Sequence, residues 1–259
     1  MFCGIDLGSR QVKIALLAGE ELAGSYLYDT IKFYKEYGRK VEGQLLIDFE
    51  ALGIGPVDYI VSTGYGRNTL DITGAKKIPE LKAHTLGAVW QTGLKDFTLL
   101  DLGGQDSKVI KVRNGKMVDF QTNDKCAASS GRYLENMAGV LGIDLAELSG
   151  YWESPVDLDA TCAIFGESEL IGRIIEGHSM ESLGAGVNYS IFRRIQLMLR
   201  EFFSEQLVFT GGVAQNKALQ KIIEKEMGCR VLVPVHPQLN GAIGCALAAR
   251  EMKEKGGQK

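Results

Sequence analysis

The chain has 259 residues, of which 45% are hydrophobic and 24% charged, and its formal net charge is −3. Such a chain can bury a sizeable globular core, and its mixed charges argue against a nucleic-acid-binding surface. No apolar run approaches the roughly 18 residues that span a membrane, and no signal-peptide pattern opens the chain, so we expect a cytoplasmic protein.

The first part of the chain predicts short strands and two helices. Alternating or apolar runs between glycine-containing turns indicate strands over 2–7, 11–19, 22–30 and 57–64. A helix is predicted over 44–53, and a second one over 79–93, where Pro79 precedes helical spacing of Leu81, His84 and Ala88. Strands therefore outnumber helices in this part.

The second part of the chain begins with predicted strands and continues with predicted helices and strands in alternation. Three strands are predicted within 97–123, and Asn114-Gly115 is a strong hairpin signal. The following segments predict helices over about 127–140, 168–177 and 181–204, a strand over 205–212, a helix over 214–228, a strand over 229–235 and a helix over 241–255. This alternation predicts an α/β fold.

A short sequence occurs twice. The segment IDLGSRQVKIAL near the start is similar to LDLGGQDSKVIK near residue 100. Lys13 follows Asp6 by seven residues, and Lys108 follows Asp101 by the same number. The similarity indicates two copies of one structural unit.

Each copy has the composition of an anion-binding turn. A strand that ends in aspartate is followed by a glycine turn whose backbone N–H groups favour anions, and the carboxylate favours a divalent cation. A third stretch, VFTGGVAQN at 208–216, is a strand that ends in Gly211-Gly212, where a flat ring or a ribose can lie against the backbone. Each motif alone could be an ordinary glycine turn; all three in this order predict a nucleotide–magnesium site. No P-loop sequence occurs.

Five cysteines are spread along the chain without a C-x-x-C pair, which argues against disulfides and a structural zinc site. Cys3, Cys229 and Cys245 lie in apolar runs and are assigned to the core. Asn123 or Asp124 as an N-cap would place Cys126 in the first turn of a helix, where the helix dipole and Lys125 stabilise a thiolate.

Cys162 also precedes a predicted helix and has small neighbours. A [4Fe–4S] cluster needs four thiolates, which two cysteines can supply only in a symmetric homodimer. The alternative is that Cys126 and Cys162 are ordinary buried thiols. The residues alone leave both interpretations open.

The three glycine motifs resemble those of the actin, sugar-kinase and heat-shock-chaperone ATPase superfamily. This resemblance implies two ribonuclease-H-like domains with ATP in the cleft between them, one formed by 1–95 plus about 240–259 and the other by 96–239. It implies that Asp6 and Asp101 organise Mg²⁺ and that Gln105 or Asp106 orients the attacking water. The implied nucleotide-binding residues are Gly8, Ser9, Lys13, Gly103, Gly104, Gly211, Gly212, Gln215 and Asn216.

Longer strings narrow the resemblance. The segments STGYGRN, DLGGQDSKVI, NDKCAASSGRYLE, CAIFGESE and TGGVAQN look like those of the activator ATPases of 2-hydroxyacyl-CoA dehydratases, a group that includes ATPase subunits of benzoyl-CoA reductases. The similarity runs from Gly4 to about Ala249. It implies one [4Fe–4S] cluster shared by a homodimer through Cys126 and Cys162 of each chain. ATP hydrolysis would then drive a low-potential electron from a ferredoxin or flavodoxin to a partner iron–sulfur enzyme in anaerobic metabolism.

Some features depart from the pattern or permit other functions. Ser129-Ser130 replaces an expected Gly-Thr-like pair, and 28–43 matches the family poorly. The partner could be a dehydratase, an aryl-CoA reductase or a double-cubane-cluster reductase. More distant alternatives are a small-molecule kinase and an ATP-dependent sensor without a cluster. Glu167 and Glu169 are expected only to favour a helix N-terminus, and His84 receives no role.

Overall fold

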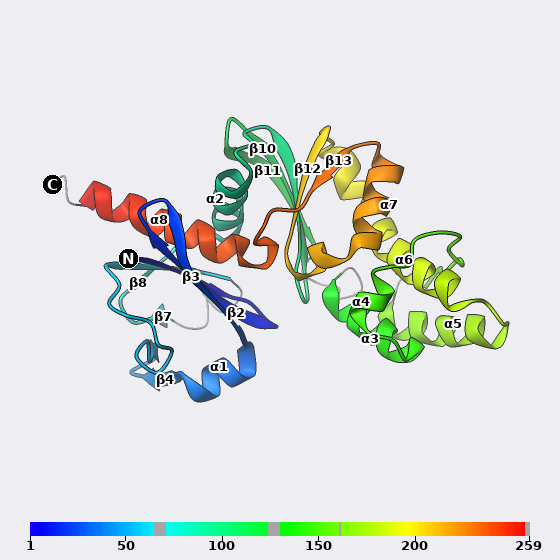
Figure 1. Ribbon diagram of the computed structural model, residues 1–259, viewed down its shortest axis with the longest axis horizontal. Coiled ribbons are helices and arrows are strands. Elements are labelled where there is room, and N and C mark those ends of the chain that lie inside the picture. The colour runs from blue at the N-terminus through cyan, green and yellow to red at the C-terminus, as the bar shows by residue number, and fades with distance from the viewer. Residues whose placement is uncertain (65–70, 124–129, 161, 257–259) are drawn as a thin grey trace. The chain divides into compact units, whose positions relative to one another are not determined.

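The computed structural model describes residues 1–64, 71–123, 130–160 and 162–256 (Figure 1). The chain forms two compact units. The first comprises 1–95, 114–117 and 238–259, and the second comprises 96–113 and 118–237.

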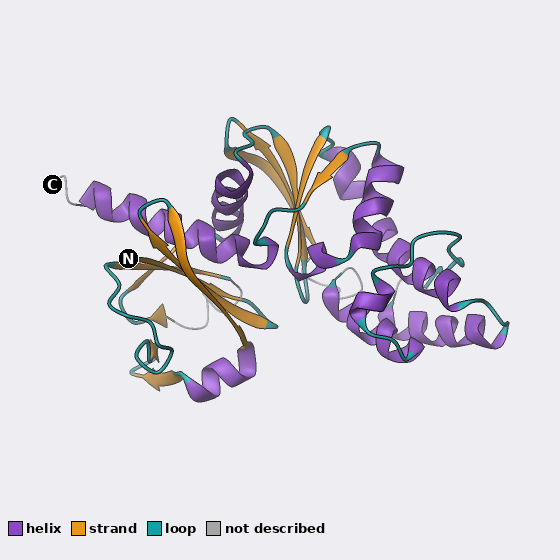
Figure 2. Ribbon diagram, in the orientation of Figure 1, coloured by secondary structure: helices purple, strands orange, loops and turns teal. Residues whose placement is uncertain are grey.

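The first unit contains a five-stranded sheet in the order β3-β2-β1-β6-β8. Its strands are β1 (Phe2–Leu7), β2 (Gln11–Ala18), β3 (Glu21–Asp29), β6 (Tyr59–Thr63) and β8 (Ala75–Lys77). β1, β2 and β3 are antiparallel, whereas β6 runs parallel to β1 and to β8. Helices α2 (Glu80–Thr92) and α8 (Asn240–Gly256) pack together, and α8 lies against β1, β2 and β6 (Figure 2).

Glycines permit the close contact of these elements. A Cβ on Gly244 of α8 would lie 1.8 Å from the carbonyl oxygen of Ala83, and one on Gly87 of α2 would lie 2.0 Å from that of Asn240. A Cβ on Gly4 of β1 would lie 2.0 Å from the carbonyl oxygen of Ala242. Any side chain at these positions would force α8 away from its neighbours.

A smaller sheet follows β3 in the first unit. It consists of β4 (Gly38–Val41), β5 (Gln44–Ile47) and β7 (Asp71–Ile72), and α1 (Thr30–Glu36) precedes it. The prediction of a helix over 44–53 is therefore wrong. Leu45 and Ile47 are buried while Leu46 is exposed, which is the period of a strand. Glu42 and Gly43 both adopt positive φ and turn β4 back onto β5.

The second unit repeats the strand order of the first. Its sheet, in the order β11-β10-β9-β12-β13, consists of β9 (Phe97–Leu102), β10 (Ser107–Arg113), β11 (Lys116–Asn123), β12 (Gln206–Thr210) and β13 (Arg230–Leu232). β10 is antiparallel to β9, and β12 is parallel to both β9 and β13. The predicted internal repeat is thus confirmed as a repeat of topology.

Helices of the second unit follow the sheet strands. They are α3 (Gly131–Leu141), α4 (Leu145–Leu148), α5 (Ala163–Ile175), α6 (Met180–Glu201) and α7 (Lys217–Met227), and the short 3₁₀ turn η3 (Gly212–Gln215) precedes α7. A second 3₁₀ turn, η4 (Pro237–Leu239), spans the point in the chain where the second unit ends and the first resumes. The second unit's apolar core is formed by α3, α6, α7 and the sheet. None of the described helices is both long and apolar enough to cross a membrane.

The start of α3 differs from the prediction. The helix begins at Gly131 with Ser130 as its N-cap, whereas Asn123 is the last residue of β11. The predicted N-cap at Asn123 and the predicted helix start at about 127 are therefore wrong for α3. Cys126, together with Asp124 and Lys125, lies outside the described residues.

Candidate functional site

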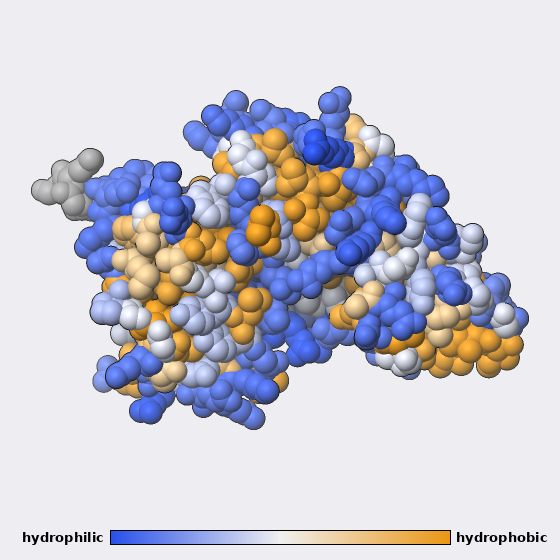
Figure 3. Space-filling model, in the orientation of Figure 1, coloured by the Kyte–Doolittle hydropathy of each residue, from blue (hydrophilic) through white to orange (hydrophobic). Residues whose placement is uncertain are grey.

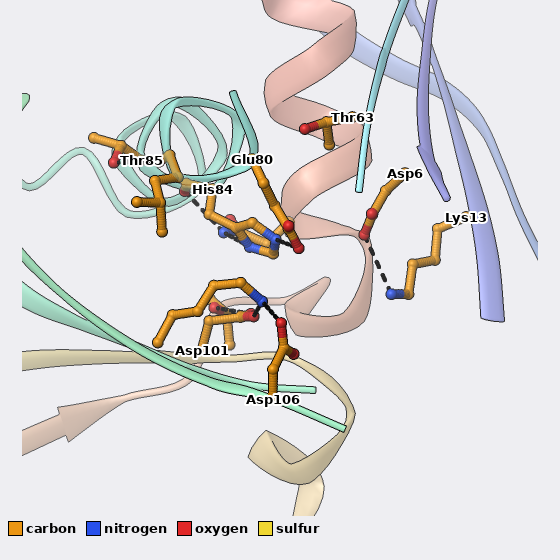
Figure 4. A network of polar contacts seen from close by, with 12 residues as sticks. Asp6, Lys13, Thr63, Glu80, His84, Thr85, Asp101 and Asp106 are labelled. Carbon is orange, nitrogen blue, oxygen red and sulfur yellow. Dashed lines mark hydrogen bonds and ion pairs between the residues drawn. The ribbon is translucent and has the colours of Figure 1, made fainter. Parts of the chain in front are cut away.

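The first unit places a buried carboxylate at the end of β1. Asp6 is 2% exposed and pairs in register with Lys13 on the antiparallel strand β2. Lys13 Nζ donates to Asp6 Oδ2 at 3.2 Å, as Figure 4 shows. The seven-residue separation seen in the sequence is therefore explained by the hairpin of β1 and β2, which places Lys13 directly opposite Asp6.

Two glycines enclose this carboxylate. Gly64 follows β6 with φ at +100°, and a Cβ there would lie 2.7 Å from Asp6 Oδ1. A Cβ on Gly241 at the start of α8 would lie 3.1 Å from Asp6 Oδ2. Gly241 was not singled out from the sequence, and Gly64 was included only within the family segment STGYGRN. Only glycine fits at these two positions, because backbone packs directly against the carboxylate.

The turn after Asp6 is fixed by the element that follows β3. Thr30 Oγ1, at the start of α1, donates to the carbonyl oxygen of Gly8 at 2.8 Å. Gly8 and Ser9 are partly exposed in this turn, as predicted phosphate-binding backbone should be. Thr30 lies in the segment 28–43, so part of that segment supports the predicted site.

The second unit builds the same arrangement around Asp101. This carboxylate is 3% exposed and pairs in register with Lys108 on β10 and with Thr210 on β12. Thr210 Oγ1 donates to Asp101 Oδ1 at 2.8 Å, and Lys108 Nζ lies 3.7 Å from Asp101 Oδ2. Because the carboxylate has charged and neutral donors beside it, its charge is compensated although it is buried.

The two candidates for orienting water have different surroundings. Lys108 Nζ donates to Asp106 Oδ2 at 2.5 Å, and a Cβ on Gly103 would lie 2.7 Å from Asp106 Oδ1. Gln105, in contrast, is exposed on the same turn. The carboxylate of Asp106 is thus committed to the turn itself.

The structural repeat extends beyond the segments found in the sequence. Thr63-Gly64 ends β6 as Thr210-Gly211 ends β12, and both strands lie parallel to the strand that carries the aspartate. Gly211 has φ at +89°, and its Cβ would lie 2.2 Å from the carbonyl oxygen of Leu102. A Cβ on Gly64 would lie 2.6 Å from that of Leu7, the equivalent residue. The Thr-Gly pair in STG at 62–64, which matches the pair in TGG at 210–212, was the sequence signal that could have revealed this second part of the repeat.

The predicted adenosine motif is held by a buried amide pair. Asn216 Oδ1 accepts from the backbone N–H of Leu219 at 2.9 Å and caps α7, while its Nδ2 donates to Asn188 Oδ1 at 2.8 Å. Asn188 on α6 donates in turn to the carbonyl oxygens of Leu148 and Tyr151. Asn216 thus serves the backbone, whereas Gly212 and Gln215 are exposed.

His84 lies near the first half of the site. Its side chain is almost fully buried on α2, and Asn240 Nδ2 donates to its backbone carbonyl oxygen at 2.9 Å. A Cβ on Gly241 would lie 3.1 Å from His84 Nε2 as well as from Asp6. His84 therefore forms part of the wall that supports the turn at Gly241.

The described cysteines differ in burial. Cys3 and Cys245 are fully buried, and burial raises the pKa of Cys3 to about 12 and that of Cys245 well above its ordinary value. Cys229 is half-buried, and burial followed by the charge of Glu224 raises its pKa. Cys162 is exposed and is the N-cap of α5, so the alternative of a core thiol is wrong for Cys162.

The donor chemistry of Cys162 fits a metal–sulfur ligand, because its sulfur is exposed at the N-cap of the 13-residue helix α5 and is the kind of atom that iron–sulfur clusters bind. The described residues contain no group of three or more histidine, cysteine or acidic side chains that could hold a metal ion. A cluster at Cys162 would therefore need further thiolates from outside the described part of one chain.

Hydrogen bonds connect α3 to the second glycine turn. The backbone N–H groups of Gly131 and Arg132 donate to the carbonyl oxygens of Gly103 and Gly104 at 2.9 and 3.1 Å, and Ser130 Oγ donates to that of Gly104 at 3.0 Å. A Cβ on Gly131 would approach the Gly103 oxygen to 3.3 Å. A movement of this turn must therefore be followed by the first turn of α3.

The chain matches the sequence model of the BadF/BadG/BcrA/BcrD ATPase family over residues 3–249. It is 36% identical over 259 residues to the (R)-2-hydroxyglutaryl-CoA dehydratase activating ATPase of Acidaminococcus fermentans, and the match covers 97% of this chain and 98% of that relative.

Two solved structures are similar along nearly the whole chain. The activator of the 2-hydroxyisocaproyl-CoA dehydratase from Clostridium difficile with bound ADPNP has a TM-score of 0.86 at 30% identity, covering 100% of this chain and 98% of the other. The Acidaminococcus fermentans (R)-2-hydroxyglutaryl-CoA dehydratase component A has a TM-score of 0.83 at 32% identity, covering 98% of each chain. These likenesses confirm the predicted fold class, an α/β protein of two ribonuclease-H-like domains of the actin-like ATPase type.

Proposed function

Because the chain belongs to the BadF/BadG/BcrA/BcrD ATPase family, we propose that it is an ATP-hydrolysing activator that transfers a low-potential electron to a 2-hydroxyacyl-CoA dehydratase-like or related reductase. The observation that carries the ATPase part is the duplicated half-site. Asp6 and Asp101 each end a central strand, each has a lysine in register, and each lies beside a positive-φ glycine or a threonine that ends the neighbouring strand.

In this proposal the nucleotide is bound by both half-sites. Asp6 and Asp101 would hold Mg²⁺ through water, and the turns at Gly8-Ser9 and Gly103-Gly104 would bind phosphates through their backbone N–H groups. The two lysines would balance the charge of the carboxylates and phosphates. Phosphoryl transfer needs mainly this positioning and charge compensation.

The adenosine would lie on the strand-to-helix segment of the second unit. Gly211 and Gly212 give the close approach to backbone, and Gln215 is exposed at the same turn. The hydrogen bond between Asn216 and Asn188 connects the end of this segment to α6. Gln105 would orient the attacking water, because Asp106 is already paired with Lys108.

Cys126 and Cys162 of each chain would bind one [4Fe–4S] cluster in a cytoplasmic homodimer. When bound, the cluster supplies one-electron transfer at low potential. The exposed thiol of Cys162 at a helix N-terminus supports its half of this assignment. The second copy is required because a four-thiolate cluster cannot be completed by two cysteines.

The surface of α5 supports a protein interface beside Cys162. Ile164 and Phe165, which follow the cysteine closely, are 74% and 70% exposed. Figure 3 shows apolar residues gathered where Figure 1 places α5. Apolar side chains of this size are seldom left in water together, and we propose that the second copy of the chain covers the end of α5 near Cys162.

Coupling between ATP and the electron would use α3. Its first turn is hydrogen-bonded to the glycine turn that would bind phosphates, so nucleotide state can reach the helix directly. ATP can drive the transfer only if it binds the docking-competent conformation more tightly than the other. The electron donor would be a ferredoxin or flavodoxin, and the acceptor an iron–sulfur dehydratase or reductase.

The deciding experiment is anaerobic purification with iron, sulfide and oligomer mass determined together. We expect about two irons per chain in a dimer, as one shared [4Fe–4S] cluster requires. An iron-free chain that hydrolyses ATP after anaerobic reconstitution would contradict the electron-transfer part and favour a small-molecule kinase or sensor. An iron-containing dimer that fails to activate a dehydratase would direct the search to double-cubane-cluster and aryl-CoA reductases.

A further inference from the structure

The segment that leads to Cys162 is held at one residue from two sides. The backbone N–H of Ala160 donates to Glu169 Oε2 at 2.9 Å, and the carbonyl oxygen of Ala160 accepts from Arg194 Nη2 at 2.8 Å. Glu169 Oε1 also accepts from the backbone N–H of Asp159 at 2.8 Å. Glu169 belongs to α5 and Arg194 to α6, so two helices fix the peptide that lies two residues before the cysteine.

Arg194 is itself fixed by packing. Its guanidinium lies over the ring of Tyr133 at 4.5 Å from the centroid, and Tyr133 is 1% exposed on α3. Nε and Nη1 of Arg194 are buried and have no hydrogen-bond partner among the described residues. Burying a guanidinium in this way costs free energy, because its lost hydration is only partly replaced by one hydrogen bond and one aromatic ring.

Residues 154–156, earlier in the same segment, are held by contacts that do not involve Glu169 or Arg194. The backbone N–H of Val156 donates to the carbonyl oxygen of Ser182 at 3.1 Å, and Ser182 Oγ donates to that of Ser154 at 2.8 Å. A Cβ on Gly186 would lie 2.5 Å from the Val156 oxygen, so α6 contacts this backbone directly. Glu169 and Arg194 are therefore the last described side-chain anchors before Cys162, which indicates a role in placing the cysteine.

We propose that Glu169 and Arg194 are positioning residues for the cysteine ligand Cys162; this inference rests on the proposed iron–sulfur function. The clamp on Ala160 presets the position of the Cys162 sulfur for cluster binding. Arg194 also brings a permanent positive charge to the backbone that leads to this cysteine. A cation near the cluster favours its reduced form.

Four variants test the clamp. Arg194→Met removes the charge and the bond to Ala160, Arg194→Lys keeps the charge, and Glu169→Gln removes one backbone acceptor. Arg193→Met is the matched control, since Arg193 is the preceding residue of α6 and makes only exposed ion pairs of 3.6 and 3.8 Å with Asp157 and Asp159.

The first measurement uses the iron-free chain. Hydrogen exchange of the Ala160 and Asp159 amides and the rate of Cys162 alkylation are followed by mass spectrometry. We expect at least tenfold faster exchange of one of these amides in Glu169→Gln, which keeps a single acceptor oxygen, and several-fold faster alkylation in Arg194→Met, which releases the backbone before Cys162, with Arg194→Lys restoring the rate. If Arg194→Met and Glu169→Gln both behave like Arg193→Met, the clamp does not exist.

The second measurement uses the reconstituted protein. Outer-shell partners of metal ligands are typically worth 10- to 100-fold in metal affinity, so iron release to a chelator should be faster by that factor in Arg194→Met and Glu169→Gln. The cluster's reduction potential should fall in Arg194→Met and recover in Arg194→Lys. An unchanged potential and release rate would overturn the proposal. A wild-type chain that binds no iron would instead contradict the proposed function. Hydrogen exchange and alkylation of the iron-free chain would still show whether Glu169 and Arg194 hold Ala160.

Discussion

Single glycines, more than charged side chains, determine where backbone can approach the two aspartates. Gly64 and Gly211 occupy equivalent places, each with positive φ and each against the carbonyl oxygen of the leucine that follows an aspartate. Neither position can accept a Cβ without moving a central strand. The geometry of the proposed nucleotide site thus depends on residues that carry no functional group.

Gly211→Ala should destabilise the second unit and weaken nucleotide binding. The new Cβ would lie 2.2 Å from the Leu102 oxygen, in addition to the cost of about 1–3 kcal/mol for a non-glycine residue at φ +89° and ψ 177°. Urea unfolding and nucleotide titration measure the two effects. Gly228→Ala is the control, because Gly228 has φ at +63° but nothing within 4 Å of the added atom. Equal losses in the two variants would show that the close approach at Leu102 is unimportant.

Cys3 makes stability depend on pH in alkaline solution. Burial raises its pKa to about 12 in the folded chain, whereas an unfolded cysteine titrates near pH 8.5. The folded thiol therefore keeps its proton over a range in which the unfolded chain loses it. The free energy of unfolding should fall as pH rises from about 9 towards 12, by roughly 1.4 kcal/mol per pH unit from this group. Cys3→Ala should show a smaller slope, and parallel curves for the two proteins would contradict the assignment.

At the scale of elements, α3 is bonded through its first turn to the predicted phosphate-binding turn of the second unit, as α1 is to that of the first unit. Ser130 contributes one of these bonds through its hydroxyl group, and Gly131 and Arg132 contribute two through their backbone. The serine was noted in the sequence only as a departure from an expected pattern. In the structure its hydroxyl group connects the start of α3 to the turn at Gly104.

Ser130→Ala should loosen the connection without unfolding the chain. Losing one hydrogen bond costs about 1 kcal/mol, and the two backbone bonds remain. The expected result is a smaller effect of ATP on the rate at which a chelator removes iron, with ATP affinity reduced less than about fivefold. Ser149→Ala serves as control, since its hydroxyl donates to the Ala146 oxygen at 2.8 Å at the end of α4. An undiminished ATP effect in Ser130→Ala would argue against coupling through this turn.

Comparison of the predicted and observed elements shows where local sequence patterns were sufficient to predict secondary structure. The helix predicted over 79–93 is α2, and the hairpin predicted at Asn114-Gly115 joins β10 to β11 because both residues adopt positive φ. The helix predicted over 44–53 failed because its apolar residues follow the period of two that β4 and β7 impose on β5. Short apolar runs do not distinguish a strand from a helix without such partners.

At the scale of the whole molecule, the chain is a duplicated sheet with one carboxylate-bearing half-site in each unit. In the proposed function, one magnesium–nucleotide complex is bound by both half-sites. A ligand that uses both halves should stabilise both units by mass action, by about 2.7 kcal/mol at a hundred times its dissociation constant.

Hydrogen exchange with and without Mg-ADP tests this expectation. Protection should increase at 6–9 and 62–64 in the first unit and at 101–106 and 210–212 in the second. Asp6→Asn should reduce the protection in both units if one magnesium–nucleotide complex connects them. Protection confined to one unit, or lost in only one unit in the variant, would contradict a shared nucleotide.

The sequence by itself determined the repeat, the three glycine motifs, the family and most strands, because these depend on neighbouring residues and on spacing along the chain. Only the tertiary structure brought Thr63-Gly64 and Gly241 to Asp6 and placed Glu169 and Arg194 on Ala160. Strand pairing and helix packing bring distant backbones together, and the side chains that meet there follow no local period. The contacts that support the proposed site therefore could not be read from the sequence, while the residues that would perform its chemistry could.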